Sequence, residues 1–315
     1  RAHLYAGVIY TYVPDHFDDF VISDRSEARP PVGDEAMRGL YDTALGHLDV
    51  AVRIARETDR PELELAALAQ RARTRHARAV WTKLNPAGAL PADPWVDDAQ
   101  ARDDALAALQ LLPEPDWALR LEYGVGTVPN QLGSQVNIRQ EFRVDDPYVV
   151  PGPDGRTVER VALEDPVSGA PDQALAGAVA AFTDGGEYPS LTVVSARELR
   201  LIAAEVELAR GELPAAVAQI DEVRGLDGRV EAAGRLTSAE DAGVGGGPGV
   251  TAAELLRHER RVNLFLQGRR LADQYRFGVQ DARWLESSDA ARVPGTFLPI
   301  TEVERISNCH LVGSC

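Results

Sequence analysis

The sequence predicts a mainly α-helical fold, in which tetratricopeptide-like helical hairpins form an α/α superhelix that carries an irregular insertion of loops and short strands. Amphipathic segments with apolar residues at three- and four-residue spacing occur on both sides of the chain's middle third. Short turns join these segments into pairs, which is typical of stacked helical repeats. The middle third is rich in proline and glycine and loses the helical spacing.

The N-terminal part supplies the first helices. A helix is expected over residues 1–13 and is ended by Pro14, and a second over residues 34–56 carries Tyr41, Leu45 and Leu48 in helical register. A third begins at Pro61, and a fourth is expected within residues 95–112, with Ala101, Ala105 and Leu109 among its apolar positions. The third helix contains four arginines between residues 71 and 78, which we expect to pair with acids of neighbouring helices rather than with nucleic acid.

The middle part, residues 113–190, is expected to be the insertion. Its alternating runs at Val136–Ile138 and Phe142–Val144 indicate short strands or extended loop. The tripeptide Pro153-Asp154-Gly155 predicts a hairpin turn, because proline fixes the first corner and glycine tolerates a positive φ.

The C-terminal helices have clear start and stop signals. Ser195 with Glu198, and Thr251 with Glu254, are capping-box patterns, and Gly211 and Gly268 interrupt the helices that follow. We therefore expect a single domain over residues 1–315. Its parts are N-terminal repeats (1–112), the insertion (113–190), C-terminal repeats (191–280) and a tail (281–315).

Composition excludes several classes of function. The 315 residues carry a net charge of −16, which disfavours nucleic acid or an anionic membrane surface as a partner. No run of about twenty apolar residues is present. The sequence contains no nucleophile-elbow, zinc-protease or phosphate-loop motif, so no catalytic residue, metal site or cofactor is expected, and the protein is not expected to be an enzyme.

Three C-terminal segments carry a resemblance. They are the helix that starts at Ser195, the segment HERRVNLFLQGRRLADQYRFG at 258–278, and FLPITEVERISN at 297–308. Together they resemble the SusD/RagB family of outer-membrane nutrient-binding lipoproteins. Matching positions are Glu259, Arg260, Gly268, Arg269 and Asp273; the chain departs from the family pattern at Asn263, Gln267 and Tyr275, which removes charges from an expected structural network.

The resemblance implies a cell-surface protein that binds a glycan or peptide without altering it. It also implies delivery of that nutrient to a SusC-like TonB-dependent outer-membrane transporter. The membrane would be reached only through a lipid anchor on a cysteine upstream of Arg1, behind a signal peptide.

The ligand is expected on loops, because loops mounted on a rigid scaffold carry most binding residues. Sugars pack on flat aromatic faces and need planar hydrogen-bonding partners for their hydroxyls. The candidate aromatic residues are Trp95, Trp117, Tyr123, Phe142 and Tyr148, and the candidate polar residues are Asn130, Gln131 and Arg139.

Two cysteines, Cys309 and Cys315, lie six residues apart near the end of the sequence, and a disulfide between them is expected, with free thiols as the main alternative. Two other functions stay open. One is a tetratricopeptide protein-interaction scaffold without a role in transport, and the other is a hydrolase built on a helical solenoid or toroid.

Overall fold

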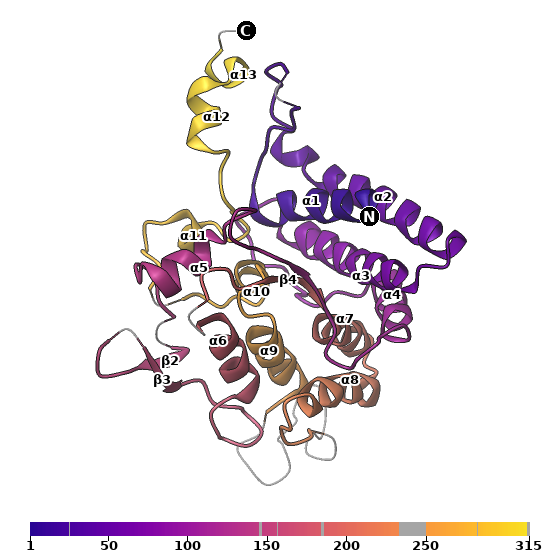
Figure 1. Ribbon diagram of the computed structural model, residues 1–315, viewed down its shortest axis with the longest axis vertical. Coiled ribbons are helices and arrows are strands. Elements are labelled where there is room, and N and C mark those ends of the chain that lie inside the picture. Colours follow the sequence, from indigo (N-terminus) through magenta and orange to yellow (C-terminus); the bar gives the residue numbers. More distant parts are fainter. Residues whose placement is uncertain are drawn as a thin grey trace. The chain divides into compact units, whose positions relative to one another are not determined.

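The computed structural model describes residues 1–24, 26–144, 147–155, 157–183, 186–232, 250–281 and 283–313 (Figure 1). The chain divides into two compact units. Unit 1 contains residues 1–111 and 268–315, and unit 2 contains residues 112–267. The prediction of one domain over the whole chain therefore stays a prediction.

Unit 1 is helical in every element that the structure describes there. Its N-terminal part contains α1 (Ala2–His16), the short 3-10 turn η1 (Asp34–Ala36), α2 (Arg38–Glu57), α3 (Pro61–Leu84) and α4 (Ala99–Leu109). Its C-terminal part contains α10 (Arg270–Arg276), α11 (Asp289–Arg292), α12 (Glu302–Ser307) and α13 (Cys309–Val312). The four long helices pack in sequence order, α1 on α2, α2 on α3 and α3 on α4, as the repeat pattern predicts.

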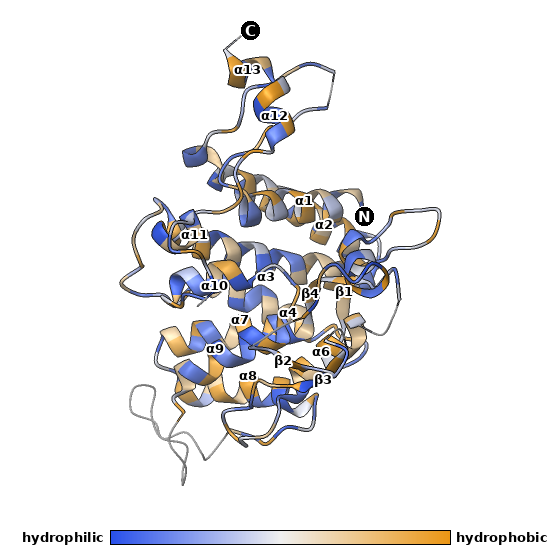
Figure 2. Ribbon diagram, turned by 90° about the vertical axis from the view of Figure 1, so that its left-hand side faces the viewer, coloured by the Kyte–Doolittle hydropathy of each residue, from blue (hydrophilic) through white to orange (hydrophobic). Residues whose placement is uncertain are grey.

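Local signals set the ends of these helices. Pro61 occupies the first turn of α3, where its missing N–H costs nothing. Asp98 caps α4 by accepting hydrogen bonds from the amides of Gln100 and Ala101. The first helix does not end at Pro14 as expected: it extends two residues further, and the amide of Phe17 donates to the carbonyl of Val13 at its end. In Figure 2, hydrophilic and hydrophobic residues alternate along α3 and α9 (Ala252–Asn263) as amphipathic helices require.

The arginines of α3 pair with acids on neighbouring helices, which confirms the prediction. Arg71 donates to both carboxylate oxygens of Asp104 on α4, with Nε to Oδ2 at 2.8 Å. Arg78 donates to Asp42 on α2 at 2.7 Å. These ion pairs fix the packing of α3 against its neighbours.

Residues from the end of the chain complete the core of unit 1. Helix α10 packs on α3, and Tyr275 and Phe297 are buried against Val80 and Leu84. The hydroxyl of Tyr275 donates to the carbonyl of Thr296 at 2.7 Å. Leu298 also forms a parallel bridge with Phe17 beside the end of α1.

Unit 2 combines helices with two small antiparallel sheets. Strand β1 (Ala118–Leu121) pairs with β4 (Leu191–Ser195), and β2 (Val149–Pro151) pairs with β3 (Val158–Val161). The helical elements are α5 (Gln131–Gly133), the π-helical turn η2 (Ser134–Ile138), α6 (Gln173–Thr183), α7 (Ala196–Ala209), α8 (Leu213–Gly225) and α9 (Ala252–Asn263).

The capping predictions for α7 and α9 are confirmed. The Ser195 hydroxyl accepts from the amide of Glu198, and Thr251 with Glu254 forms both halves of a capping box. Gly211 has a φ of +77° after α7, and α8 follows directly to form the predicted hairpin.

The middle segment differs from expectation at η2 and at α6. Val136–Ile138 lies in η2, so neither a strand nor an extended loop forms there. Phe142–Val144 is irregular loop, which is one of the two expected states. Helix α6 was not expected within the insertion. The hairpin turn at Pro153-Asp154-Gly155 is confirmed: it joins β2 to β3, and Gly155 has a φ of +67°.

Among the described residues, no helix combines the length and the apolar character needed to cross a membrane.

Candidate ligand-binding site

A pocket of about 880 Å³ lies in unit 2 beside the β2–β3 turn, and we call it the hairpin pocket. Its size falls within the range typical of small-ligand sites, about 300–1,000 Å³. It is formed by η2 and the loop after it, by the hairpin, and by the end of α6. The lining residues are Val136, Asn137, Gln140, Glu141, Phe142, Arg143, Val144, Asp154, Gly155, Thr157, Val158 and Thr183.

Asn130 anchors the segment that enters this pocket. Its side chain caps α5 by accepting from the amide of Gly133 at 3.0 Å, and it donates to the carbonyl of Pro189 at 2.6 Å. A Cβ atom on Gly133 would lie 2.5 Å from Cδ of Pro189, so only glycine permits this close contact. The two segments are therefore held firmly together.

Asn137 holds η2 against the end of α6. Its side-chain amide donates to the carbonyl of Phe182 at 2.9 Å and to that of Gly186 at 2.7 Å. These tertiary hydrogen bonds stabilise the π-helical turn. The alternation of side chains alone had indicated a strand or extended loop at this place.

The opposite wall is the hairpin turn. Asp154 accepts hydrogen bonds from the amide and the hydroxyl of Thr157, at 2.9 and 2.8 Å. Across the pocket, Arg143 donates to the carbonyl of Gly155 at 2.8 Å. The turn and the loop that contains Phe142 are thus connected by a direct hydrogen bond.

Phe142 is the aromatic residue of the hairpin pocket, and 59% of its surface is exposed. Planar hydrogen-bonding side chains line the same pocket, from Asn137, Gln140, Glu141 and Arg143. An exposed ring flanked by amide, carboxylate and guanidinium groups can pack on the C–H face of a sugar and pair with its hydroxyls.

The other sequence-predicted residues have different surroundings. Asn130 is buried in the anchor just described, Gln131 is exposed beside it, and exposed Arg139 lies 3.8 Å from Glu141. Tyr148 packs on Phe265, with the Arg261 guanidinium 4.7 Å from its ring centre.

Trp95, Trp117 and Tyr123 are half-buried. The carbonyl of Trp117 accepts a hydrogen bond from the amide of Ala196 at the edge of the β1–β4 sheet. Trp95 belongs to unit 1, where its ring lies 5.0 Å from that of Phe277. Binding by these residues stays a prediction, as does the disulfide, because Cys315 lies outside the described residues.

Sequence reasoning missed the polar members of the hairpin pocket. Asn137, Gln140, Glu141 and Arg143 flank Phe142 within a few residues, and that proximity was an available signal. The turn residues Asp154 and Thr157 could not be assigned to the same pocket without the hairpin geometry.

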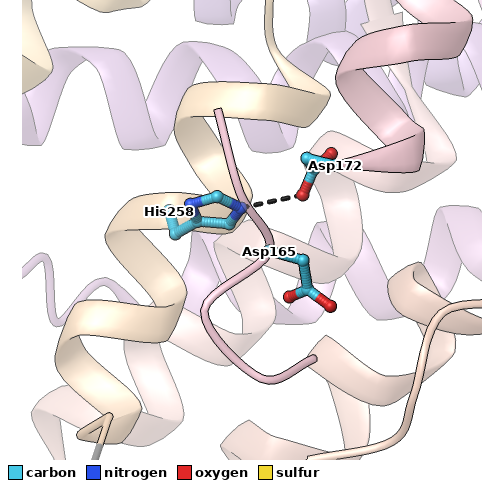
Figure 3. A group of neighbouring side chains, drawn as sticks. All are labelled: Asp165, Asp172 and His258. Carbon is cyan, nitrogen blue, oxygen red and sulfur yellow. Dashed lines mark hydrogen bonds and ion pairs between the residues drawn. The ribbon is translucent and has the colours of Figure 1, made fainter. Parts of the chain in front are cut away.

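A second group of polar side chains in unit 2 has the residue types of a metal site. Ligand atoms of Asp165, Asp172 and His258 lie within 4.8 Å of one another, and Figure 3 shows His258 directed at Asp172, with 2.8 Å between Nε2 and Oδ2. Oxygen and imidazole ligands at this spacing could suit a divalent cation.

Two buried arginines already occupy these carboxylates. Arg224 binds both oxygens of Asp165 at 3.0 and 2.9 Å, and Arg229 donates to Asp172 at 3.2 Å. Both arginines also donate to Glu259 at 2.7–3.0 Å. Two guanidinium charges beside the carboxylates disfavour a cation, and the group is best described as a structural charge cluster.

The pKa values agree with that description. Burial works to raise the pKa of Asp165, but hydrogen bonds from Arg224 and Ser168 hold that pKa at about 2. Burial likewise opposes ionisation of Asp172, and its hydrogen bond with His258 keeps the pKa of Asp172 below its usual value. Both aspartates are therefore ionised at neutral pH.

The fold is one of paired helices with two small antiparallel sheets, and the hairpin pocket in unit 2 is built largely from loops and lined mainly by polar side chains. In comparisons with solved structures, the chain is similar to a SusD-like carbohydrate-binding protein from Bacteroides vulgatus, with a TM-score of 0.53 and 12% identity. That similarity covers 99% of this chain and 76% of the other. The chain therefore has the SusD-like fold that the C-terminal segments predicted.

A SusD superfamily protein from the same organism has a TM-score of 0.46 and 12% identity, over 87% of this chain and 65% of that one. No protein-family model matches the sequence, and no curated protein matches it.

Proposed function

We propose that this protein belongs to the SusD/RagB family and binds a nutrient glycan in the hairpin pocket without cleaving it. The observation that carries the proposal is the exposed ring of Phe142 among planar hydrogen-bonding side chains in a pocket of about 880 Å³. The SusD-like fold supports the same function, because a solved protein with this fold is described as carbohydrate-binding.

A second part of the proposal concerns the cellular location of the protein and its partner protein. The protein is anchored by lipid at the outer face of the outer membrane and passes its ligand to a SusC-like TonB-dependent transporter. The test is purification of the tagged protein from detergent-solubilised membranes of its native host. We expect a TonB-dependent transporter to copurify, and recovery of the protein in the soluble fraction without one would overturn this part.

Glycan binding is tested by calorimetric titration with a panel of neutral oligosaccharides. Phe142→Ala is expected to weaken binding about tenfold, roughly 1.4 kcal/mol, because the apolar face of the sugar loses its aromatic partner. The matched control is Tyr12→Ala, which removes an aromatic ring of similar exposure, 55%, from α1 in unit 1.

Three outcomes would contradict the proposal. Equal affinity of wild type and Phe142→Ala would remove the hairpin pocket as the site. Shorter saccharides accumulating during incubation with the protein would show that it is a hydrolase. Binding of short peptides in place of every glycan would show that the nutrient is not a glycan.

A further inference from the structure

A second pocket, of about 430 Å³, lies in unit 2 against α6, and we call it the α6 pocket. It shares no lining residue with the hairpin pocket. Its walls come from the exposed side of α6, the β1–β4 sheet and the chain just after α9. Its lining includes small apolar residues of α6 and the charged residues Asp116, Arg120, Arg197 and Asp227.

Small residues of α6 form the apolar wall. Ala174, Gly177, Ala178 and Ala181 follow the spacing of one helix face, and all four line the pocket. Phe265 also lines it. A Cβ atom added to Gly177 would meet nothing within 4 Å, so the space beside this helix face is open.

A rigid ionic group forms part of the polar wall. Arg197 donates to both oxygens of Asp116 at 2.7 Å and to both oxygens of Asp227 at 2.7 and 2.9 Å. A fifth bond reaches Asn263 at 2.9 Å. These bonds use all five N–H groups of the guanidinium, so Arg197 serves to position the acids and not to bind a ligand.

Opposite charges remain accessible at this polar end. The side chain of Asp116 is 52% exposed, and its oxygens keep lone pairs beyond those that Arg197 uses. Arg120 is exposed and lines the same pocket. With Asp227 and Arg197 the lining charges sum to zero, two acids against two arginines, which suits a ligand that carries one charge of each sign.

We propose that the α6 pocket binds a free α-amino acid with an apolar side chain, such as leucine. The ammonium group pairs with Asp116, the carboxylate pairs with Arg120, and the side chain lies against Gly177 and Ala178. The pocket volume exceeds that of one such molecule, and the arrangement satisfies each part of it: two charges and one apolar group.

The test is calorimetric titration of the full chain with L-leucine and two analogues. 3-Methylbutylamine lacks the carboxylate, and 4-methylpentanoate lacks the ammonium group. We expect leucine to bind with a Kd on the order of 1 mM or tighter, and each analogue to bind at least about tenfold more weakly.

Two charge variants assign the contacts. Asp116→Asn should weaken leucine and the amine about tenfold and leave the carboxylate analogue unchanged, whereas Arg120→Gln should weaken leucine and the carboxylate analogue and leave the amine unchanged. Equal effects of both variants on all three compounds would overturn the proposed orientation and the proposal with it.

An occluding variant tests the pocket itself. Gly177→Leu places a side chain in the open space and should abolish leucine binding, while Gly46→Leu, at an equally unobstructed helical glycine in unit 1, should not. Phe142→Ala should leave leucine binding intact, which separates this site from the glycan site. Unchanged leucine affinity in folded Gly177→Leu, or no binding by wild type, would refute the proposal.

Discussion

Glu259 is fully buried and accepts hydrogen bonds from Arg224, Arg229 and Asn263. The family resemblance implies a structural network of charges in this segment, and Glu259 lies in such a network. Asn263, one of the positions where the chain lacks the acid common in that family, donates to Glu259 in place of carrying another charge. The sequence could not indicate Arg224 as a member, because its acidic partner Asp165 is 59 residues away along the chain.

Replacing Arg224 should destabilise the protein strongly. In Arg224→Met, Asp165 and Glu259 lose a shared counter-charge in a buried site, and we expect the free energy of unfolding to fall by about 3–5 kcal/mol. Urea denaturation measures the change. Arg53→Met removes an exposed pair with Glu57 and should cost less than about 0.5 kcal/mol; a similar loss in both variants would contradict the buried-charge explanation.

Asp165 should make stability depend on pH in the acid range. Because its pKa in the folded protein is about 2, below the ordinary 3.8, its contribution is fully present above pH 3.8 and is lost as the pH falls towards 2. The stability gap between wild type and Asp165→Asn should shrink by roughly 2 kcal/mol over that interval.

Urea denaturation at pH 5, 4, 3 and 2 checks the shape of that curve. Asp103→Asn, at a side chain that is 64% exposed, is the control and should show a much smaller change in the gap. Parallel curves for wild type and Asp165→Asn would show that the carboxyl has no depressed pKa.

Phe142 was identifiable from the sequence as an exposed loop aromatic, because it lies in a segment without helical spacing. Tyr148 could not be separated from it, since both are aromatic residues in the same segment. Only the contacts of Tyr148 with Phe265 and Arg261 show that its ring is used in packing. Aromatic residues in a loop are therefore only candidates for a ligand surface, and burial decides which of their rings is accessible.

At the level of elements, helices with a polar face and a capping signal were predictable. The helix from Pro61 to Leu84 has its predicted start, and the helices capped by Ser195 and Thr251 begin where expected, with a complete capping box at Thr251. Helix α6 was missed because its sequence, QALAGAVAAFT, has no charged face to define a period. The turn η2 was missed because tertiary bonds from Asn137 outweigh the local strand preference of valine and isoleucine.

Two glycines in the α1–α2 pair predict opposite effects of the same substitution. A Cβ on Gly7 would lie 2.5 Å from Cγ of buried Leu48, so Gly7→Ala should force the helices apart and cost about 1–3 kcal/mol. Gly46 on α2 has open space around it, and Gly46→Ala should stabilise the protein by about 0.5–1 kcal/mol. Thermal denaturation of both variants compares them, and a stabilised Gly7→Ala would disprove the close contact.

For the whole molecule, the net charge of −16 governs encounters with other polymers. The arginines of α3 are paired with acids of unit 1 in the contacts described above, so they form no free basic surface. We therefore expect no DNA binding tighter than about 1 mM at 150 mM salt, by fluorescence polarisation with a labelled duplex. Saturable binding that weakens steeply with salt would contradict this expectation.

Unit 1 is built from two segments, residues 1–111 and 268–315, which unit 2 separates along the chain. This arrangement has a consequence for synthesis. Val80 and Leu84 leave the ribosome long before Tyr275 and Phe297, which cover them in the finished protein. During that interval the nascent chain exposes an unfinished apolar surface on α3, a target for chaperones and a risk for aggregation. A chain that terminates early, at residue 267, would keep that surface permanently, however well the intervening unit had folded.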